Sequence, residues 1–544
     1  MGPVAHCERQ PCCGMTRLVS LQAESNEINM NRCGTASRMF IPQVCVICIL
    51  FVLTVATADC QLVTGANHDD SEIDIGLENQ LLFDDSLIES KQGFRTTMNP
   101  ATRTDHPVLE PQREWETYGC FAPTVLVREG VYHMWYGATG EDSKSRLCYA
   151  TSENGIQWQR AGLRMYAYKG RRETNIVFPH YGSVFFDPAA KPGQNFKMIG
   201  GWREKYQYRN VYDGGARFRY EDPPPATWHY TAVSGACSPD GIHWAECSRN
   251  PIMPWYTDTR NVAFRDDRTG KYVAYVRWNE HFRIEDGVVK GSFDYRAIAR
   301  AESDDFENFP PPEKIMEPDF SDPEDKDLWG GGLYDSAAMK YPFAANVYFM
   351  FTAAYHHTSD TLDIQLAVSR DGKSFHRWHE PFLRLGREGT FDSSMIYMGV
   401  GMLPVGDEIW MYYAGYDKLH DQAPVDSYRS AIGRVKVRRD GFVSQDAPAE
   451  GGVLTTRAFN LQGNRLLVNM DASSRGGLRV EILDEAGRVI PGFSRVDADR
   501  LDRNDLRKVV TWKGNSALST LDGQKVRLRF IGERVKLYAF RFVE

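Results

Sequence analysis

The sequence predicts an all-β protein, a five-bladed β-propeller followed by a small antiparallel β-sandwich. Three observations predict this fold class. A short turn motif recurs along most of the chain, and repeats of this size are typical of stacked or radial architectures. Each repeat holds several short strand-like runs and no convincing amphipathic helix, as in propeller blades of four strands. A second group of short strands, separated by turn residues, closes the sequence and is typical of a sandwich.

The turn motif joins a small polar residue, an Asn or Asp and a Gly, and an aromatic residue follows. Clear copies stand at 152–158, 238–244 and 369–375, a copy without Gly stands at 303–309, and a weaker one at 438–444. The copies follow one another at intervals of roughly 65 to 86 residues. Asn-Gly and Asp-Gly supply the positive φ that tight hairpins need, so we expect a structural role.

Five apolar runs are expected to be the first strands of the blades. They lie near 122–127, 182–186, 261–264, 336–339 and 399–403, and we expect them to converge on one axis within a propeller that spans 75–443. In such a blade, the entry to the first strand and the exit of the second share one face. The Asp/Asn-Gly turns therefore belong to the opposite face.

The C-terminal part is divided from the propeller by a short polar stretch. Residues 444–452, Ser-Gln-Asp-Ala-Pro-Ala-Glu-Gly-Gly, predict a linker. Residues 453–544 hold at least five short strand-like runs and predict the β-sandwich.

The N-terminal part predicts a targeting segment over 1–58. An apolar run over 40–56 follows Arg32 and Arg38, and Ala56-Thr-Ala58 matches the small-residue pattern of a cleavage site. We expect a signal peptide, export to the periplasm or the medium, and no membrane contact after cleavage; an uncleaved anchor is the alternative. Met30 is a second candidate start.

Composition limits the function. The net charge is −8 without a basic stripe, which argues against nucleic acid as a partner. Aromatic residues make up 12% of the chain, which suits both blade packing and a carbohydrate site. The Cys residues after the predicted cleavage site are odd in number and form no CxxC motif among themselves, which argues against zinc, although Cys237 and Cys247 flank one turn and could pair. No cofactor is predicted, and a structural calcium ion is left open.

Two segments carry a resemblance to a known superfamily. Together with the predicted architecture, Leu82-Phe-Asp-Asp-Ser-Leu-Ile88 and the strands between Val468 and Phe542 resemble furanosidase-type glycoside hydrolases of families 32 and 43 and their relatives. The turn motif resembles the Asp-box of such propellers. The Asn-Asp-Pro-Asn motif of family 32 is absent, and Arg265-Asp-Asp267 and Glu246-Cys247, which are similar to its other two motifs, lie away from the expected funnel. The resemblance therefore assigns no catalytic residue.

Glycoside hydrolysis needs two carboxyl groups across the scissile bond, and in a propeller they should lie where first strands begin. Four residues meet this condition: Asp258, Asp335, Glu116 and Asp392. Asp258 and Asp335 precede neighbouring first strands and form the preferred pair. Arg260, two residues from Asp258, is expected to keep Asp258 ionised as base or nucleophile, which leaves Asp335 as the acid.

Further charged residues are expected to line the same funnel and to bind substrate. They stand at strand-two exits, strand-three starts and first-strand entries: His180, Arg203, Arg260, Arg277, Glu280, Arg296, His356, Asp417 and Arg429, with Glu141 and His357 beside them. Several Arg at one mouth suit an anionic sugar through charge-assisted hydrogen bonds, and structural ion pairing is the competing account.

Two functions follow from these observations. The first is a secreted glycoside hydrolase-like protein that acts on a polysaccharide or oligosaccharide; the alternative is a non-catalytic carbohydrate-binding propeller. A structural or interaction scaffold is a third, less favoured by the polar funnel. Fold alone does not decide between them, because propellers host many functions.

Overall fold

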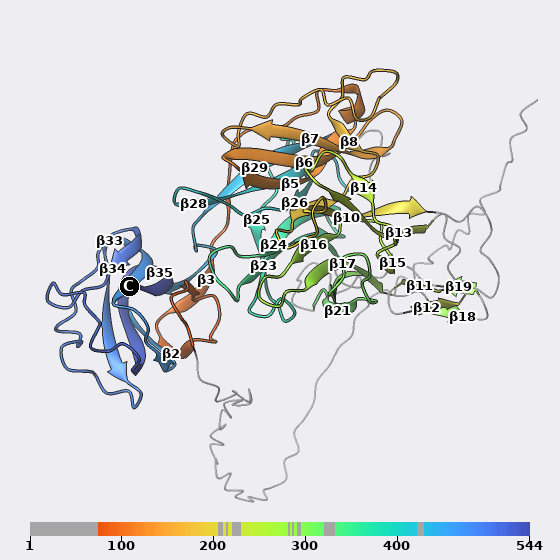
Figure 1. Ribbon diagram of the computed structural model, residues 1–544. Helices are drawn as coiled ribbons and strands as arrows, with labels where there is room; N and C mark the ends of the chain where they lie inside the picture. The colour runs from red at the N-terminus through yellow and green to blue at the C-terminus, as the bar shows by residue number, and fades with distance from the viewer. Residues whose placement is uncertain are drawn as a thin grey trace, which may run out of the picture. The chain divides into compact units, whose positions relative to one another are not determined.

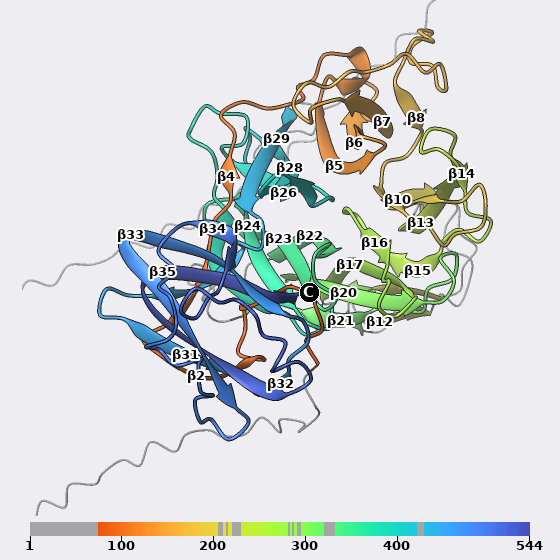
Figure 2. The same cartoon turned by 60° about the vertical axis from the view of Figure 1, so that its left-hand side comes forward.

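The protein is described by a computed structural model that covers residues 74–204, 210–213, 216–219, 230–280, 283–285, 288–290, 295–319, 332–420 and 429–544. The described part is all-β, and its single helical element is a 3₁₀ turn, η1 (Glu114–Glu116). Figures 1 and 2 show its strands gathered in several twisted sheets. None of the described segments forms a helix with the length and apolarity needed to span a membrane. The predicted targeting segment lies outside the described residues.

Four-stranded antiparallel sets recur along the described chain, and the first four of them begin at the expected first strands. The first three sets are β5 (Gly119–Arg128), β6 (Val131–Thr139), β7 (Ser145–Ser152) and β8 (Ile176–Phe178); β9 (Ser183–Phe186), β10 (Phe196–Glu204), β13 (Tyr230–Ser238) and β15 (Met253–Tyr256); and β16 (Val262–Arg265), β17 (Tyr272–Glu280), β20 (Tyr295–Ser303) and β21 (Glu313–Met316).

The last two sets share one extended sheet. They are β22 (Gly332–Lys340), β23 (Tyr348–His356), β24 (Thr361–Ser369) and β25 (His376–Leu383); and β26 (Met395–Met398), β28 (Glu408–Tyr416), β29 (Ser430–Arg438) and β4 (Thr102–Arg103). Shorter strands add to these sets: β11 (Asn210–Asp213), β12 (Ala216–Arg219), β14 (Ala245–Glu246) and β27 (Leu403–Val405), while β18 (Arg283–Glu285) and β19 (Val288–Lys290) pair with each other. Because β4 precedes β5 in the chain, the segment before the first set supplies the outer strand of the last.

The first strands of the five sets contact one another in sequence, from β5 through β9, β16 and β22 to β26, and β26 returns to β5. Two backbone hydrogen bonds fasten this last contact. Val125 donates to the carbonyl of Val400 over 2.8 Å, and Val400 donates to that of Pro123 over 2.8 Å. The contacts among the first strands therefore close a ring.

The recurring turns have the structural role that we expected. In the first copy, the Ser152 hydroxyl accepts from the backbone N–H of Gly155, and the Asn154 side-chain oxygen accepts from those of Ile156 and Gln157. The copies at 238–244 and 369–375 repeat this pattern. The polar side chain thus satisfies the backbone of its own turn, as Asx turns do.

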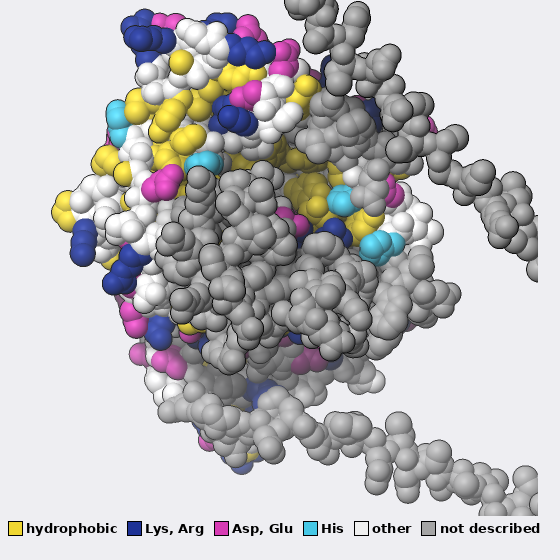
Figure 3. Space-filling model, turned by 90° about the vertical axis from the view of Figure 1, so that its right-hand side faces the viewer, with side chains coloured by type: hydrophobic (Ala, Val, Ile, Leu, Met, Phe, Trp, Pro, Cys, Tyr) yellow, Lys and Arg dark blue, Asp and Glu magenta, His cyan; other side chains and the backbone are white. Residues whose placement is uncertain are grey.

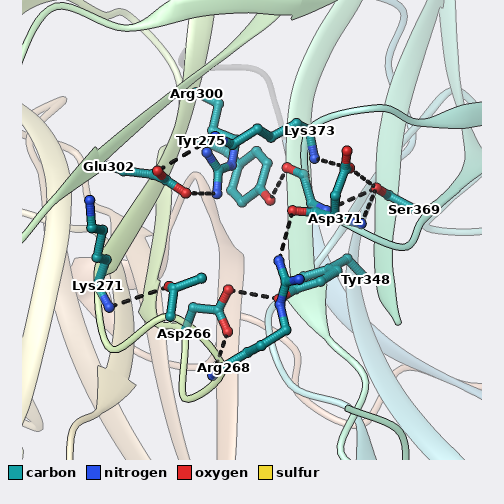
Figure 4. Close-up of polar contacts among 12 residues, drawn as sticks. Asp266, Arg268, Lys271, Tyr275, Arg300, Glu302, Tyr348, Ser369, Asp371 and Lys373 are labelled. Carbon is teal, nitrogen blue, oxygen red and sulfur yellow. Dashed lines mark hydrogen bonds and ion pairs between the residues drawn. The ribbon is translucent and has the colours of Figure 1, made fainter. Parts of the chain in front are cut away.

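The same turns also tie neighbouring sets together. An aromatic side chain on the second strand of the preceding set donates to the turn glycine's carbonyl: Tyr412 to Gly155, Trp135 to Gly241 and Tyr275 to Gly372. The last of these lies within the network of Figure 4, where Arg268 also reaches the Asp371 carbonyl and Lys373 faces Glu302. The repeat in the sequence therefore encodes a repeated contact between sheets.

The C-terminal sheet has a core of its own. Its strands are β30 (Val443–Ala447), β31 (Gly452–Thr456), β32 (Phe459–Asn460), β33 (Arg465–Asp484), β34 (Asp505–Val509) and β35 (Lys525–Val543). Long β33 and β35 pair along most of their length, and Trp512, Phe530 and Leu478 are buried beneath them. These strands appear in blue in Figure 1.

Two predicted boundaries differ from the structure. Residues 444–447, predicted as part of a linker, lie in β30, where Ser444 and Gln445 are fully buried and the Gln445 side chain donates to the Leu82 carbonyl. The segment after residue 75, predicted to start the propeller, forms β1 (Gln80–Leu81), β2 (Ile88–Gln92) and β3 (Arg95–Met98) in the C-terminal sheet. N-terminal strands thus complete a sheet whose other strands lie hundreds of residues away, and local composition does not encode such pairing.

The fifth first strand is also displaced from its predicted position. The run expected at 399–403 falls between β26 and β27, because Gly399 approaches the Pro123 and Tyr412 carbonyls closely and Gly401 takes a φ of +123°. Val400 forms a bridge to Thr124. The apolar run was correctly found, but its middle serves contact with β5 rather than regular pairing.

Candidate functional site

A pocket of about 320 Å³ opens where the first strands of several sets begin. Its walls come from β5, β22, β26 and β28 and from the segments that precede β9 and β16. The lining residues are Phe121, Ala122, Tyr181, Asp258, Thr259, Arg260, Tyr334, Asp335, Met395, Tyr397, Ala414, Tyr416 and His420. A concave site with aromatic walls and a few converging polar groups is the usual form of a small-molecule site.

Two β-bulges aim residues into this pocket. In β5 the register with β6 shifts between Phe121 and Thr124, and in β22 the register with β23 shifts between Leu333 and Ser336. The second bulge includes Asp335. Bulges re-aim side chains and are frequent next to active sites.

Asp335 is the buried carboxyl group of the pocket, with 3% of its side chain exposed. Its Oδ2 lies 3.0 Å from Nη2 of Arg260, whose side chain is equally buried. Oδ1 has no hydrogen-bond partner in the described part of the chain. Burial raises the pKa of Asp335 above its ordinary value, and this effect outweighs the opposing charges of Arg260 and Arg277.

Asp258 is the accessible carboxyl group, with 38% of its side chain exposed. Its Oδ1 accepts from Nη1 of Arg277 over 2.6 Å, and Arg277 is almost fully buried. Nε and Nη2 of Arg277 donate to the Tyr334 carbonyl over 3.1 and 2.7 Å. The expectation that Arg260 is the partner of Asp258 is therefore wrong. Each carboxylate has its own arginine, because Arg260 reaches the neighbouring first strand instead.

Tyrosine rings form much of the pocket wall. The Tyr334 ring lies 4.2 Å from the guanidinium carbon of Arg277 and 4.7 Å from that of Arg296, and its hydroxyl is 3.0 Å from His420 Nε2. Burial raises the pKa of Tyr181 to about 12, so this phenol stays neutral at physiological pH. Figure 3 shows hydrophobic side chains bordered by acidic, basic and histidine side chains on one face of the molecule.

Glu116 and Asp392 do not line the pocket. Glu116 is fully buried and accepts from Tyr136 over 2.6 Å and from Arg160 over 2.9 Å. Asp392 is buried as well and accepts from Arg103, on the closing strand β4, over 2.6 Å. Both carboxylates hold parts of the fold together in this structure.

The predicted binding residues divide into three groups. Arg260 lines the pocket, and Arg277 and Arg296 pack against its residue Tyr334. The second group has other contacts or is exposed. His180 stacks on Trp202, His356 lies 3.1 Å from Asp363, and His357 packs on Tyr355. Glu141 pairs with Lys169, and Asp417 and Arg429 are exposed. The side chains of Arg203 and Glu280 lie outside the described residues.

A second hollow, of about 660 Å³, lies at the other ends of the first strands. Arg265 and Asp267 line it, so the Arg-Asp-Asp segment is indeed remote from the pocket. Asp266 accepts from Tyr348 over 2.7 Å (Figure 4). No cluster of three or more His, Cys, Asp or Glu side chains among the described residues could hold a metal ion. Cys237 and Cys247 are free thiols with their sulfurs 3.9 Å apart.

The tyrosine wall and His420 are not among the site residues predicted from the sequence. Tyr181, Tyr334 and Tyr397 stand at first-strand entries, the same positions that selected Asp258 and Asp335. Applying that positional criterion to aromatic residues would have found them. His420 follows the exit of β28, and its contact with Tyr334 depends on tertiary structure that no local pattern encodes.

No family model matches the chain. A curated 1,2-beta-oligomannan phosphorylase from Thermoanaerobacter sp. (strain X514) is 36% identical over 63 residues, which cover 11% of this chain and 21% of that protein. The chain thus aligns with about a fifth of the relative's length.

The chain is also similar to solved structures that include glycoside hydrolases. A glycosyl hydrolase from Bacteroides ovatus has a TM-score of 0.40 and 14% identity, with 62% of this chain and 94% of that one covered. A thermostable family-43 glycoside hydrolase has a TM-score of 0.37 and 15% identity, with 60% and 89% covered.

Proposed function

We propose that the chain is a five-bladed β-propeller with a C-terminal β-sandwich, and that it acts as a glycoside hydrolase through Asp335 and Asp258. The closed ring of first strands and the five four-stranded sets support the propeller. One observation carries the activity: two carboxyl groups from neighbouring first-strand entries line one aromatic pocket in opposite environments. Such a pair divides acid and base roles.

The environments assign the roles. Asp335 is buried and burial raises its pKa, which suits it to the role of the acid that protonates the glycosidic oxygen of the leaving group. Asp258 is more exposed, and its carboxyl group pairs with Arg277 over 2.6 Å. It acts on the other side of the bond as base or nucleophile. Tyrosine rings offer flat apolar surfaces to the C–H faces of a sugar.

Export completes the proposal. The apolar run over 40–56 and Ala56-Thr-Ala58 support cleavage after Ala58 and action outside the cytoplasm on a polysaccharide or oligosaccharide. N-terminal sequencing of the protein recovered from the periplasm or medium should then begin at Asp59. A sequence that still contains residues 40–56 would contradict cleavage.

Activity is tested with the exported protein on a panel of polysaccharides, neutral and acidic, by release of reducing ends. Asp258→Asn and Asp335→Asn should each abolish release while retaining the wild-type circular-dichroism spectrum. Asp502→Asn, the same substitution at an exposed acid of the C-terminal sheet, is the matched control and should keep full activity. If either pocket variant keeps near wild-type activity, the role of that residue is wrong.

Two other outcomes have their own readouts. A carbohydrate-binding propeller without catalysis would bind panel members and release nothing, and binding is followed by affinity electrophoresis. The short similarity to an oligomannan phosphorylase favours phosphorolysis as a second candidate, which would release sugar phosphate only when inorganic phosphate is added. Running the panel with and without phosphate separates hydrolysis from phosphorolysis.

A further inference from the structure

Arg260 is a buried guanidinium with unused hydrogen-bond donors. Only 3% of its side chain is exposed. Arg260 lies in the segment that joins β15 to β16, and it lines the pocket. Nη2 faces Asp335, but Nε and Nη1 have no hydrogen-bond partner in the described part of the chain. An arginine has five N–H donors and no acceptor, and buried donors are nearly always satisfied. Acceptor oxygens from outside the described chain would complete this site.

The charges around the pocket point to the kind of acceptor. Asp258 is matched by Arg277 and Asp335 by Arg260. Arg296 packs on Tyr334 and Tyr355 through its guanidinium and has no carboxylate partner among the described residues, and its Nε is buried without a hydrogen bond. Among the side chains that the structure describes, three guanidinium groups therefore lie in or beside the pocket with two carboxyl groups. The imbalance grows when Asp335 is protonated, as its burial favours.

We infer that this pocket selects a saccharide that carries an oxyanion, a carboxylate or a sulfate ester, and that Arg260 binds the oxyanion. The inference rests on the proposed carbohydrate function and names its substrate class. An oxyanion supplies several acceptors to one guanidinium, and charge-assisted hydrogen bonds of this kind are about twice as strong as neutral ones. A neutral sugar would satisfy the donors but would leave the extra positive charge unbalanced.

The geometry gives Arg260 a second effect on the reaction. An anion on Arg260 would compete with Asp335 for the same guanidinium, since Nη2 lies 3.0 Å from Asp335 Oδ2. A bound anion would also repel the ionised form of Asp335. Both effects favour the protonated acid when the acidic substrate is in place, so binding and proton donation are coupled at one pair of side chains.

The test uses the full exported chain and three probes in calorimetric titrations. An oligogalacturonate is compared with its methyl ester, a sulfated oligosaccharide with its desulfated form, and inorganic phosphate is titrated alone. We expect one acid form to bind at least about tenfold more tightly than its neutral counterpart. Arg260→Gln should bring this ratio close to one, and Arg296→Gln should lower it partly. Arg503→Gln, at an exposed position of the C-terminal sheet, should leave it unchanged.

The outcomes separate the two proposals. Equal binding of acid and neutral forms, or no binding of either pair, overturns the inference, and hydrolysis of neutral polysaccharide would then still support the proposed function. Preference for an acidic saccharide without turnover supports the inference and contradicts the hydrolase. If inorganic phosphate binds and no saccharide does, the site binds a free anion, and the inference that it selects an acidic saccharide is overturned. If Arg260→Gln does not fold, Arg260→Lys keeps the charge with fewer donors and should lower the ratio.

Discussion

Two buried carboxylate–arginine pairs of this protein differ in how completely their polar atoms are bonded. Glu116 lies in η1 and Arg160 in the segment between β7 and β8. The Glu116 carboxylate also accepts from the Tyr136 hydroxyl and the Gln112 backbone N–H, and the Arg160 guanidinium also donates to the Gln112 side chain and the Glu110 carbonyl. Asp335 and Arg260 are as deeply buried but keep atoms without partners. We call the first pair closed, because its carboxylate oxygens and guanidinium nitrogens all have hydrogen-bond partners. We call the second pair open, because it keeps atoms without partners and faces a pocket.

The difference teaches how to separate structural from functional charges in a sheet protein. Buried ion pairs are stabilising only when further hydrogen bonds satisfy their remaining atoms. A pair that lacks those bonds costs stability in the free protein, and a ligand that supplies them recovers the cost. Incomplete bonding beside a cavity is therefore stronger evidence for a site than burial or charge alone.

The largest expected effect is on turnover at the open pair. Asp335→Asn keeps the size and burial of the side chain but removes its transferable proton. Because a positioned general acid contributes about 10²–10⁴-fold, we expect kcat to fall by that factor on any substrate with a poor leaving group. Measuring kcat on an activated aryl glycoside, which needs little protonation, should show a smaller loss. An equal loss on both substrates would mean that Asp335 is not the acid.

The next effect concerns stability at the closed pair. Glu116→Ala leaves Arg160 buried without its carboxylate, and breaking a buried pair in this way costs about 3–5 kcal/mol. Chemical denaturation should show this loss in the free energy of unfolding. Asp335→Asn should show much less, because its pair is already incompletely bonded. A larger loss for Asp335→Asn than for Glu116→Ala would break the comparison between the two pairs.

How far sequence alone reaches can be judged on these same residues. The recurring turns predicted the all-β character of the chain, because Ser, Asp and Gly each satisfy a local backbone requirement at the turn. Strand order then selected Asp258 and Asp335 among many acids. It selected Glu116 and Asp392 equally, although both carboxylates accept hydrogen bonds from side chains elsewhere in the fold and do not line the pocket. Which arginine meets which carboxylate depends on contacts between sets, and no local pattern contains that information.

The pH dependence of stability sharpens the comparison further. Burial raises the pKa of Asp335, so the unfolded chain ionises at lower pH than the native protein. Stability that is present below the ordinary Asp pKa is then lost as pH rises through the raised value. Asp335→Asn has no such group, so its stability relative to wild type should increase from acidic to neutral pH. Asp440, whose pKa burial also raises, is present in both proteins and cancels in the difference. A difference that is independent of pH would contradict a raised pKa at Asp335.

The smallest effect tests whether closed hydrogen bonds between sets are purely structural. The Tyr275 hydroxyl donates to the Gly372 carbonyl over 2.7 Å, far from the pocket and in the network of Figure 4. Tyr275→Phe removes this bond and the contact of the hydroxyl with the Arg300 side chain while keeping the ring. It should cost at least about 1 kcal/mol in the free energy of unfolding. Tyr118→Phe, at a tyrosine whose hydroxyl makes no hydrogen bond in the described part of the chain, is the matched control and should cost less.

Turnover and substrate affinity should be unchanged in both variants, because the polar atoms of a closed contact already have partners and are not available to a ligand. A loss of turnover in Tyr275→Phe at full stability would show that closure of the polar atoms does not separate structural from functional contacts in this fold.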